Sequence, residues 1–352
     1  MATFKPIWFD SLGAKSSCIL IEHKDVRLII DPGVAIMHPS FPASYELKLK
    51  WMFMAEEAIR KNMSKADIII ITHYHYDHFM NFEEELYAGK IILAKNPNEY
   101  INDSQRKRAI EFYSELFEKL GKLKLKDIML EAAMKEYHNP LLELNFASNR
   151  DYGDYTDRKR ELLNKGFQWF RNRAEKWVKW RRIPEYEFNE NNTKLIFADN
   201  RLIEYKGLKI KFTKPLFHGI EFSRVGWIVG VVIEAGKFKL LYSSDVNGPI
   251  IEDYAEWIIS EKPNIIILDG PMTYMLGYML NKINLRRTIE NAVRIIEEAN
   301  ANLIIYDHHL PRERKFREHT KEVWKKAERE GVKIMTAAEY LGKTPVVLVK
   351  WQ

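Results

Sequence analysis

A cluster of histidines behind an apolar run constrains this chain more than any other feature. His73, His75 and His78 fall within six positions, although the chain has only 10 histidines in 352 residues. Asp77 lies among them, and the β-branched run Asp67–Thr72 in front of them predicts a buried strand. If the strand continues extended, His73 and His75 point to the same side, and a turn then brings Asp77 and His78 to face the same space. Partly exposed loop histidines are the alternative. Imidazoles beside a carboxylate at a strand end are typical of a zinc-type metal site, which the spacing favours.

The remainder of the chain alternates between strand-like and helical segments. Short apolar runs bounded by turn residues predict strands, and longer amphipathic stretches predict helices. The predicted strands are Ser17–Ile21, Arg27–Ile30, Asp67–Thr72, Lys90–Ala94, Leu202–Tyr205, Leu208–Thr213, Val225–Glu234, Lys239–Ser243, Asn264–Leu268, Leu303–Tyr306 and Lys333–Thr336. The predicted helices in these parts are Tyr45–Met63, Leu285–Ala299 and His319–Glu330. Many short strands in each half with helices between them indicate a layered α/β fold, with sheets inside and helices outside.

Residues 98–192 differ from the rest, because strand-like runs vanish and long charged patterns with scattered aromatic residues take over. We interpret this segment as a helical insertion into one discontinuous domain made of residues 1–97 and 193–352. The insertion could serve as a lid over an active site or as a binding platform.

The most basic part of this segment is Lys165–Arg182, where Glu175 is the only acid. Aromatic and basic side chains recur there at helical spacing and share one face: Trp169, Arg173, Trp177 and Trp180. The pattern favours a helix whose tryptophans pack onto the main domain. The alternative is a surface that binds phosphates and stacks bases.

Composition narrows the class of protein. A hydrophobic share of 46% and a charged share of 30% suit a soluble globular protein. The single cysteine, Cys18, cannot form an intrachain disulfide. The chain has no apolar run of about 18 residues and does not open like a secretory signal, so we expect a cytoplasmic protein without a membrane partner. Abundant Lys, Glu and Ile weakly indicate a thermophile. The net charge of +6 mildly favours an anionic partner, and a homo-oligomer stays possible.

Five segments, in order along the chain, resemble motifs of the metallo-β-lactamase superfamily. They are RLIIDPG, THYHYDH, LFHGIEFS, LLYSSDVNGP and LIIYDHH. The second is highly specific, and the others become persuasive through their order. The opening, with ILIE and then LIIDP, most resembles the branch that contains ascorbate-phosphate lactonases and uncharacterised archaeal hydrolases. The resemblance implies an αββα sandwich, here with a helical insertion.

The resemblance also implies a centre with two divalent metal ions, above all Zn²⁺, with Mn²⁺ or Fe²⁺ as alternatives. The implied ligands are His73, His75 and His218 for one ion, Asp77, His78 and His308 for the other, and Asp245 as the bridge. Asp245 follows an apolar strand and opens a Gly-Pro turn, which suits a carboxylate that emerges at a strand end.

Several neighbouring positions stay open at this point. Counting forward from the strand LIIY favours His308 over His309 as the ligand. His309 is then a candidate proton donor to the leaving group, although a solvent-facing neighbour is the favoured interpretation. Asp31 either orients a ligand histidine or caps a turn. Asp269 is interpreted as a turn residue, with a place beside the ligands or the substrate as the alternative.

The leading functional hypothesis is hydrolysis by a hydroxide that two metal ions activate, with Asp77 and Asp245 positioning the nucleophile. Basic residues in the insertion and the run Pro311–Lys315 slightly favour a phosphodiester or another phosphate-bearing substrate, which includes nucleic acids. One alternative is hydrolysis of a lactone or thioester. Another is a non-catalytic nucleic-acid-binding protein with a structural metal site. A di-iron redox protein ranks last, because nothing in the chain resembles a flavodoxin-like module.

Overall fold

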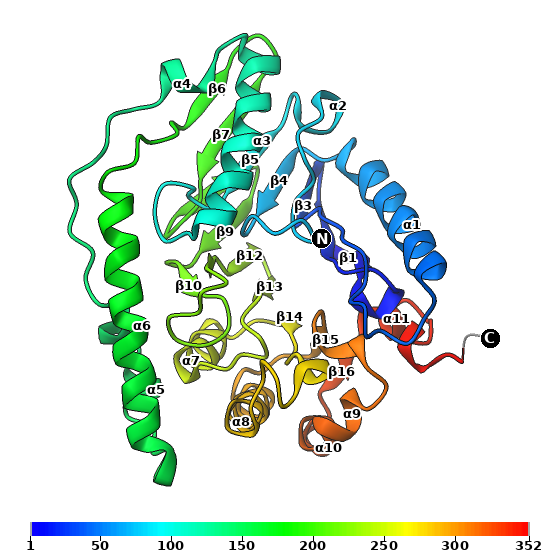
Figure 1. Cartoon of the computed structure of the whole chain (residues 1–352). Helices are drawn as coiled ribbons and strands as arrows, with labels where there is room; N and C mark the ends of the chain where they lie inside the picture. Colours follow the sequence, from blue (N-terminus) through cyan, green and yellow to red (C-terminus); the bar gives the residue numbers. More distant parts are fainter. Residues whose placement is uncertain (1, 351–352) are drawn as a thin grey trace.

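Two seven-stranded sheets form the centre of the chain (Figure 1). The computed structural model describes residues 2–350. The first sheet has the strand order β1 (Thr3–Phe9), β2 (Ser17–His23), β3 (Val26–Ile30), β4 (Ile68–Ile71), β5 (Ile91–Ala94), β7 (Thr193–Phe197), β6 (Tyr186–Phe188). The second has the order β16 (Lys333–Met335), β15 (Leu303–Asp307), β14 (Ile265–Asp269), β13 (Phe238–Tyr242), β12 (Val231–Ala235), β9 (Leu208–Phe212), β8 (Leu202–Tyr205). In each sheet, four neighbouring strands run parallel and the remaining ones pair antiparallel.

The alternation of side chains along the strands divides the core in two. In β4, Ile68 and Ile70 belong to the apolar core between the two sheets, whereas Ile69 and Ile71 lie in the core under the outer helices. All four isoleucines are fully buried, as expected for a parallel strand covered on both faces.

Helices cover both outer faces. In Figure 1, α1 (Tyr45–Met63) and α3 (Asp103–Gly121) lie over the first sheet. The second sheet is covered by α7 (Glu252–Glu261), α8 (Lys282–Glu298) and α10 (Lys321–Glu330). The structure therefore confirms the predicted αββα sandwich. Short helices complete it: α2 (Glu84–Tyr87), α4 (Leu125–Ile128), α5 (Asn145–Ser148), α9 (Phe316–His319) and α11 (Ala337–Tyr340). Within residues 2–350, no helix combines the length and the apolar character needed to cross a bilayer.

Three strands of the first sheet were not predicted, and one predicted strand is divided. The missed strands are β1, which contains Pro6 and an irregular register there, β6 and β7. The predicted strand Val225–Glu234 forms β11 (Trp227–Ile228) and β12, and β11 pairs with β10 (Leu216–Phe217) outside the large sheets. The break falls at Gly230, where a Cβ would lie 2.3 Å from the Trp257 ring.

The expectation that strands vanish between residues 98 and 192 is wrong, because β6 lies in this range and pairs with β7. The helix α3 also packs into the main core through Phe112 and Leu116. The long helix α6 (Thr156–Trp177) runs along the outside of the molecule (Figure 1). The limits of the helical insertion stay a prediction.

The tryptophans of α6 and the turn behind it pack inwards. Trp177 is 2% exposed and donates its indole N–H to the Ile101 carbonyl. Trp169 stacks on Trp227 with an angle of 9° between the rings, and Trp180 lies under the Arg106 guanidinium. The structure confirms the packing interpretation. Trp169 and Trp180 are half-buried, and a base-stacking role for them stays the alternative.

A buried ionic network fixes α6 to the second half of the fold. Arg287 of α8 pairs with Glu221 at 2.7 Å and with Glu252 of α7 at 2.6 Å. Lys159 of α6 pairs with Glu221 at 2.7 Å. Glu221 follows His218 by three residues, so the network also holds the loop that carries this histidine.

We expect this network to make the free energy of unfolding decrease as the pH falls into the acid range. Burial raises the pKa of Glu221, but Arg287 and Lys159 outweigh burial and lower it from an ordinary value of 4.5 to about 2. A carboxyl group with a depressed pKa stabilises the fold above its unfolded pKa, and this contribution is lost as the pH falls from about 4.5 to about 2. The loss should amount to about 3 kcal/mol. Urea unfolding measured across this pH range will show a smaller slope for Glu221→Gln than for the wild type.

The matched control is Glu328→Gln, on an exposed stretch of α10. Tyr152 and Glu252 also face the network, but Tyr152 is uncharged in this pH range and Glu252 is present in the wild type and the variant alike. Equal slopes for Glu221→Gln and the wild type would contradict this assignment.

Candidate metal centre

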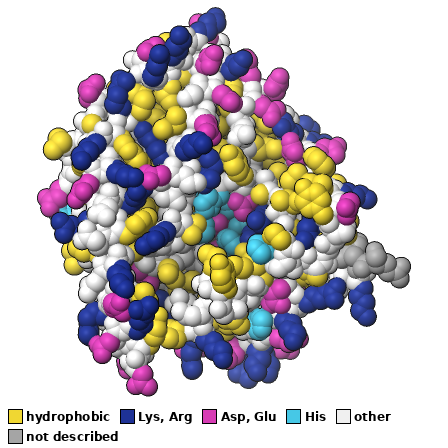
Figure 2. All heavy atoms as spheres, in the orientation of Figure 1, with side chains coloured by type: hydrophobic (Ala, Val, Ile, Leu, Met, Phe, Trp, Pro, Cys, Tyr) yellow, Lys and Arg dark blue, Asp and Glu magenta, His cyan; other side chains and the backbone are white. Residues whose placement is uncertain are grey.

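The predicted ligands emerge where strands of both sheets end. His73, His75, Asp77 and His78 follow β4, and His308 follows β15. Asp245 follows β13, and His218 follows β10. Figure 2 shows histidine side chains gathered at the floor of a hollow near the middle of this face. The structure thus brings together all seven residues that the sequence predicts as ligands.

Left-handed backbone turns occur at three strand ends that border the centre. Asp31, Ser244 and His308 stand just behind β3, β13 and β15 and have φ angles of 48°, 54° and 46°. This conformation is unfavourable for residues other than glycine and is maintained only where surrounding contacts hold it. Three of the strand ends that build the centre thus carry a residue in this strained conformation.

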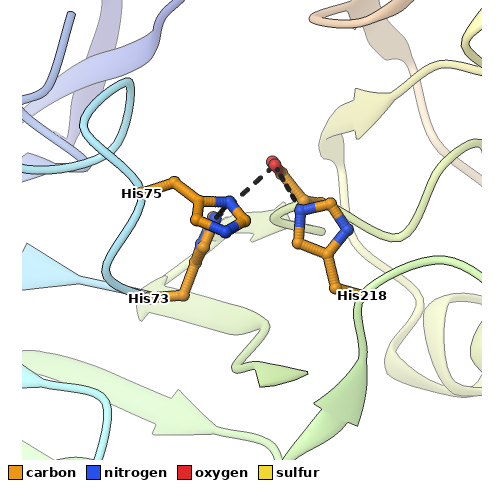
Figure 3. Close-up of side chains that lie close together, drawn as sticks. His73, His75 and His218 are labelled. Atoms are coloured by element: carbon orange, nitrogen blue, oxygen red, sulfur yellow. Dashed lines mark hydrogen bonds and ion pairs between the residues drawn. The ribbon is translucent and has the colours of Figure 1, made fainter. Parts of the chain in front are cut away.

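The first group of ligand atoms consists of His73, His75, His218 and Asp245, whose donor atoms lie within 4.8 Å of one another (Figure 3). His73 Nε2 lies 3.0 Å from His75 Nδ1. His218 Nε2 lies 3.1 Å from Asp245 Oδ2. Three nitrogens and one carboxylate oxygen thus converge on one point, which is a donor set that suits zinc.

The second group consists of Asp77, His78 and His308, again within 4.8 Å of one another. The Nε2 atoms of His78 and His308 are 3.2 Å apart. His308 Nε2 lies 4.0 Å from Asp77 Oδ2. This group has two imidazoles and one carboxylate, and it also lies against Asp245.

Asp245 connects the two groups. Its Oδ2 faces the first group, whereas its Oδ1 lies 3.1 Å from His78 Nε2 and 3.4 Å from His308 Nε2. Asp245 is 2% exposed, and its Oδ1 has no hydrogen-bond partner. A buried charged oxygen without a hydrogen bond is costly. A cation on each side of the carboxylate would remove this cost, so the residues fit a pair of metal ions.

Asp31 orients one of the histidines. Its Oδ2 lies 2.8 Å from His78 Nδ1 and also accepts hydrogen bonds from the hydroxyls of Thr72 and Tyr242. Its Oδ1 accepts the backbone N–H of Thr72. The sequence left Asp31 open between orienting a ligand and capping a turn, and the contacts identify it as the residue that orients His78.

Asp10 orients His308 in the way that Asp31 orients His78. The sequence did not predict this role of Asp10. Its Oδ1 lies 3.2 Å from His308 Nδ1, and its Oδ2 accepts a hydrogen bond from Arg312 Nε. Burial raises the pKa of this carboxyl group, but Arg312 and His308 lower it well below its usual range. The signal for Asp10 was its place directly behind β1, the strand that the sequence did not predict.

His309 and Asp269 form a further pair, and both favoured interpretations of them are wrong. His309 is 7% exposed instead of facing solvent, and its Nδ1 lies 2.8 Å from Asp269 Oδ1. Its Nε2 lies 4.0 Å from Asp245 Oδ2. Asp269 is no simple turn residue, because it also accepts the Asn247 backbone N–H. The positive φ of His308 turns the chain so that both neighbouring histidines face inward.

The ionisation of the centre follows from its burial and crowding. Burial, and next the His218 imidazole, lower the pKa of His75 to about 3. Burial also lowers the pKa of His78, but Asp245 and Asp31 outweigh it and raise that pKa to about 10. A proton on His78 and a metal ion would compete for the same nitrogen, because only neutral imidazole binds a metal.

Known proteins resemble this chain at the level of family and fold. The model of the metallo-β-lactamase superfamily matches residues 13–121. UPF0282 protein MJ1629 of Methanocaldococcus jannaschii is 30% identical over 359 residues, which cover 97% of this chain and 92% of that protein. The UPF0282 protein of Korarchaeum cryptofilum is 29% identical over 345 residues, or 96% and 89% of the two chains.

Among solved structures, the metallo-β-lactamase fold protein YhfI of Bacillus subtilis has 15% identity and a TM-score of 0.44, with 95% of each chain covered. The family model and the relatives confirm the predicted resemblance to the metallo-β-lactamase superfamily and the presence of archaeal relatives. The resemblance to ascorbate-phosphate lactonases stays a prediction. The chain belongs to the UPF0282 proteins, within the metallo-β-lactamase superfamily, whose members are largely metal-dependent hydrolases.

Proposed function

We propose that this protein is a hydrolase that depends on two divalent metal ions and acts on phosphate-bearing substrates, phosphodiesters foremost. The observation that carries the proposal is the position of Asp245, with one oxygen towards each of two groups of ligand atoms. In the proposed assignment, His73, His75 and His218 would hold one ion, Asp77, His78 and His308 would hold the other, and Asp245 would contribute one oxygen to each. Zn²⁺ is the preferred ion because imidazoles predominate, and Mn²⁺ or Fe²⁺ are the alternatives.

Two metal ions supply the chemistry that the side chains lack, because they lower the pKa of water and polarise the oxygen of the scissile bond. The protein's own groups orient the reactants. Asp77 and Asp245 lie where they can position the attacking water. His309 is the candidate proton donor to the leaving group, since Asp269 holds its Nδ1 and its Nε2 faces Asp245.

Purified protein with its metal content measured should be tested on three substrates. We expect metal-dependent cleavage of bis-p-nitrophenyl phosphate, with little turnover of a simple lactone or thioester. A chelator should abolish the activity, and Zn²⁺, Mn²⁺ or Fe²⁺ should restore it. Cleavage of only the lactone or thioester would contradict the phosphate preference and favour the second candidate, an ester-type hydrolase. Full activity in protein free of metal would contradict the proposal as a whole.

A further inference from the structure

Arg312 lies beside the metal centre with part of its guanidinium unused. The residue is 3% exposed and ends a short 3-10 helix four residues after His308. Its Nε donates to Asp10, and its Nη1 donates to the Tyr274 hydroxyl at 2.9 Å. The Tyr274 ring also lies under the guanidinium, 5.4 Å from its carbon. Two of the three nitrogens are therefore committed, and the side chain is held in one orientation.

The third nitrogen, Nη2, is buried and has no hydrogen-bond partner. Asp77 Oδ2 lies 4.0 Å from Nη2, which is too far for a hydrogen bond. A buried charged donor that makes no hydrogen bond costs free energy, and native proteins rarely leave one without a purpose. Nη2 therefore presents an unused N–H donor next to the predicted ligand Asp77.

Lys15 brings a second cation to the same place. Its side chain is largely buried, and no hydrogen bond or ion pair of its ammonium group occurs within the described residues 2–350. Burial, and then the charge of Arg312, lower the pKa of Lys15, whereas Asp77 and Asp10 oppose this shift. The backbone N–H of the next residue, Ser16, donates to Asp10 Oδ1 at 3.0 Å. Asp10 also holds Arg312, so Lys15 lies on the segment that borders Arg312.

We propose that Arg312 and Lys15 form an oxyanion subsite beside the Asp77 side of the metal centre, which binds a phosphate or carboxylate group carried by the substrate. Asp10 and Tyr274 hold Arg312 in place without using Nη2, so this donor is preorganised for a ligand. Asp77 is 16% exposed, which leaves its side of the centre open to solvent. With a cation bound to Asp77, its negative charge no longer repels an anion.

A phosphate is the favoured group because the two cations come from separate segments, at residues 15 and 312. A tetrahedral group with several oxygens can contact both of them while another oxygen reaches the metal centre. That the bound group belongs to a substrate rests on the proposed hydrolase function. That Arg312 and Lys15 bind an anion is independent of this function.

The test is calorimetric titration of the metal-loaded protein with inorganic phosphate and, separately, with acetate. Lys15→Gln and Arg312→Lys should each weaken phosphate binding by about tenfold, equivalent to ~1.4 kcal/mol. The control variants are Lys237→Gln, in an exposed turn, and Arg329→Lys, on an exposed part of α10, and both should bind phosphate like the wild type. Metal content and circular dichroism identify any variant that fails to fold or to load. If Arg312→Lys fails in this way, Lys15→Gln still decides the question.

The two anions distinguish the possible ligands of the subsite. Weaker binding of phosphate in the variants supports a phosphate subsite, and weaker binding of acetate alone supports a carboxylate subsite. Unchanged binding of both anions would overturn the proposal and leave Arg312 as a structural partner of Asp10. A protein that hydrolyses nothing but loses phosphate binding in these variants would refute the proposed function while keeping the subsite.

Discussion

Replacement of Asp245 by alanine should deprive both halves of the centre of metal. The wild-type protein should bind about two ions per chain, and the variant should retain less than one, because a single carboxylate faces both ligand groups. Affinity for metal should fall by at least about 100-fold, the upper end of what loss of an orienting contact alone causes. Hydrolytic activity should fall at least as far. Elemental analysis after dialysis against a defined zinc buffer measures the first effect.

The control for this prediction is Asp25→Ala, in the exposed turn between β2 and β3, which should keep its full metal content. Removal of Asp245 leaves His78 and His308 without a buried acidic partner on this side, which can destabilise the fold. Asp245→Asn preserves the size of the side chain and serves as the second variant. If a folded Asp245→Asn or Asp245→Ala protein kept two ions, the assignment of the bridge would be wrong.

Replacement of Gly33 by alanine should disturb the fold and the centre together. A Cβ at this position would lie 2.3 Å from the backbone nitrogens of both His78 and Phe79, and backbone atoms cannot rotate away as a side chain can. Either Asp31-Pro32-Gly33 or the histidine loop must move. We expect the free energy of unfolding to fall by about 3 kcal/mol, at the upper end of the usual cost of overpacking. Chemical unfolding and metal analysis of the same samples test both effects.

Gly236→Ala is the comparison for this prediction. Gly236 lies in a turn with φ of 63° and has no atom within 4 Å of its added Cβ, so this variant should lose only about 1 kcal/mol and keep its metal. The loss of unfolding free energy in Gly33→Ala should therefore exceed the loss in Gly236→Ala. Equal losses at the two glycines would show that the contact with His78 is unimportant.

The sequence predicted which side chains lie close together, because part of their signal is local. His73, His75 and His78 are close in sequence, and the continuous apolar run in front of them is typical of a strand covered on both faces. Asp245 and His308 each follow a predicted strand, and strands that end at one edge bring their next residues together. His218 was predicted from the segment LFHGIEFS alone, because the short strand β10 in front of it was not predicted. Their roles as ligands stay a prediction, although the structure places them side by side.

The residues that orient the ligands could not be predicted in the same way. Asp10 contacts His308 across nearly 300 positions of the chain, and its place behind β1 could not be used because that strand was not predicted. His309 looks like an exposed neighbour of a ligand until the left-handed backbone at His308 is known. Likewise, nothing in the alternation of Val225–Glu234 announces that Trp257 packs on Gly230 and interrupts the strand. Such features depend on tertiary packing, which single-sequence patterns do not record.

The carboxylate of Asp10 touches a predicted metal ligand with one oxygen and the arginine of the proposed anion subsite with the other. A change at Asp10 would therefore affect both the binding of the metal ion and the preference for an anionic substrate. A lineage that exchanged Asp10 would alter both in one step, so relatives with a different residue there should differ in their metal as well as in their substrates.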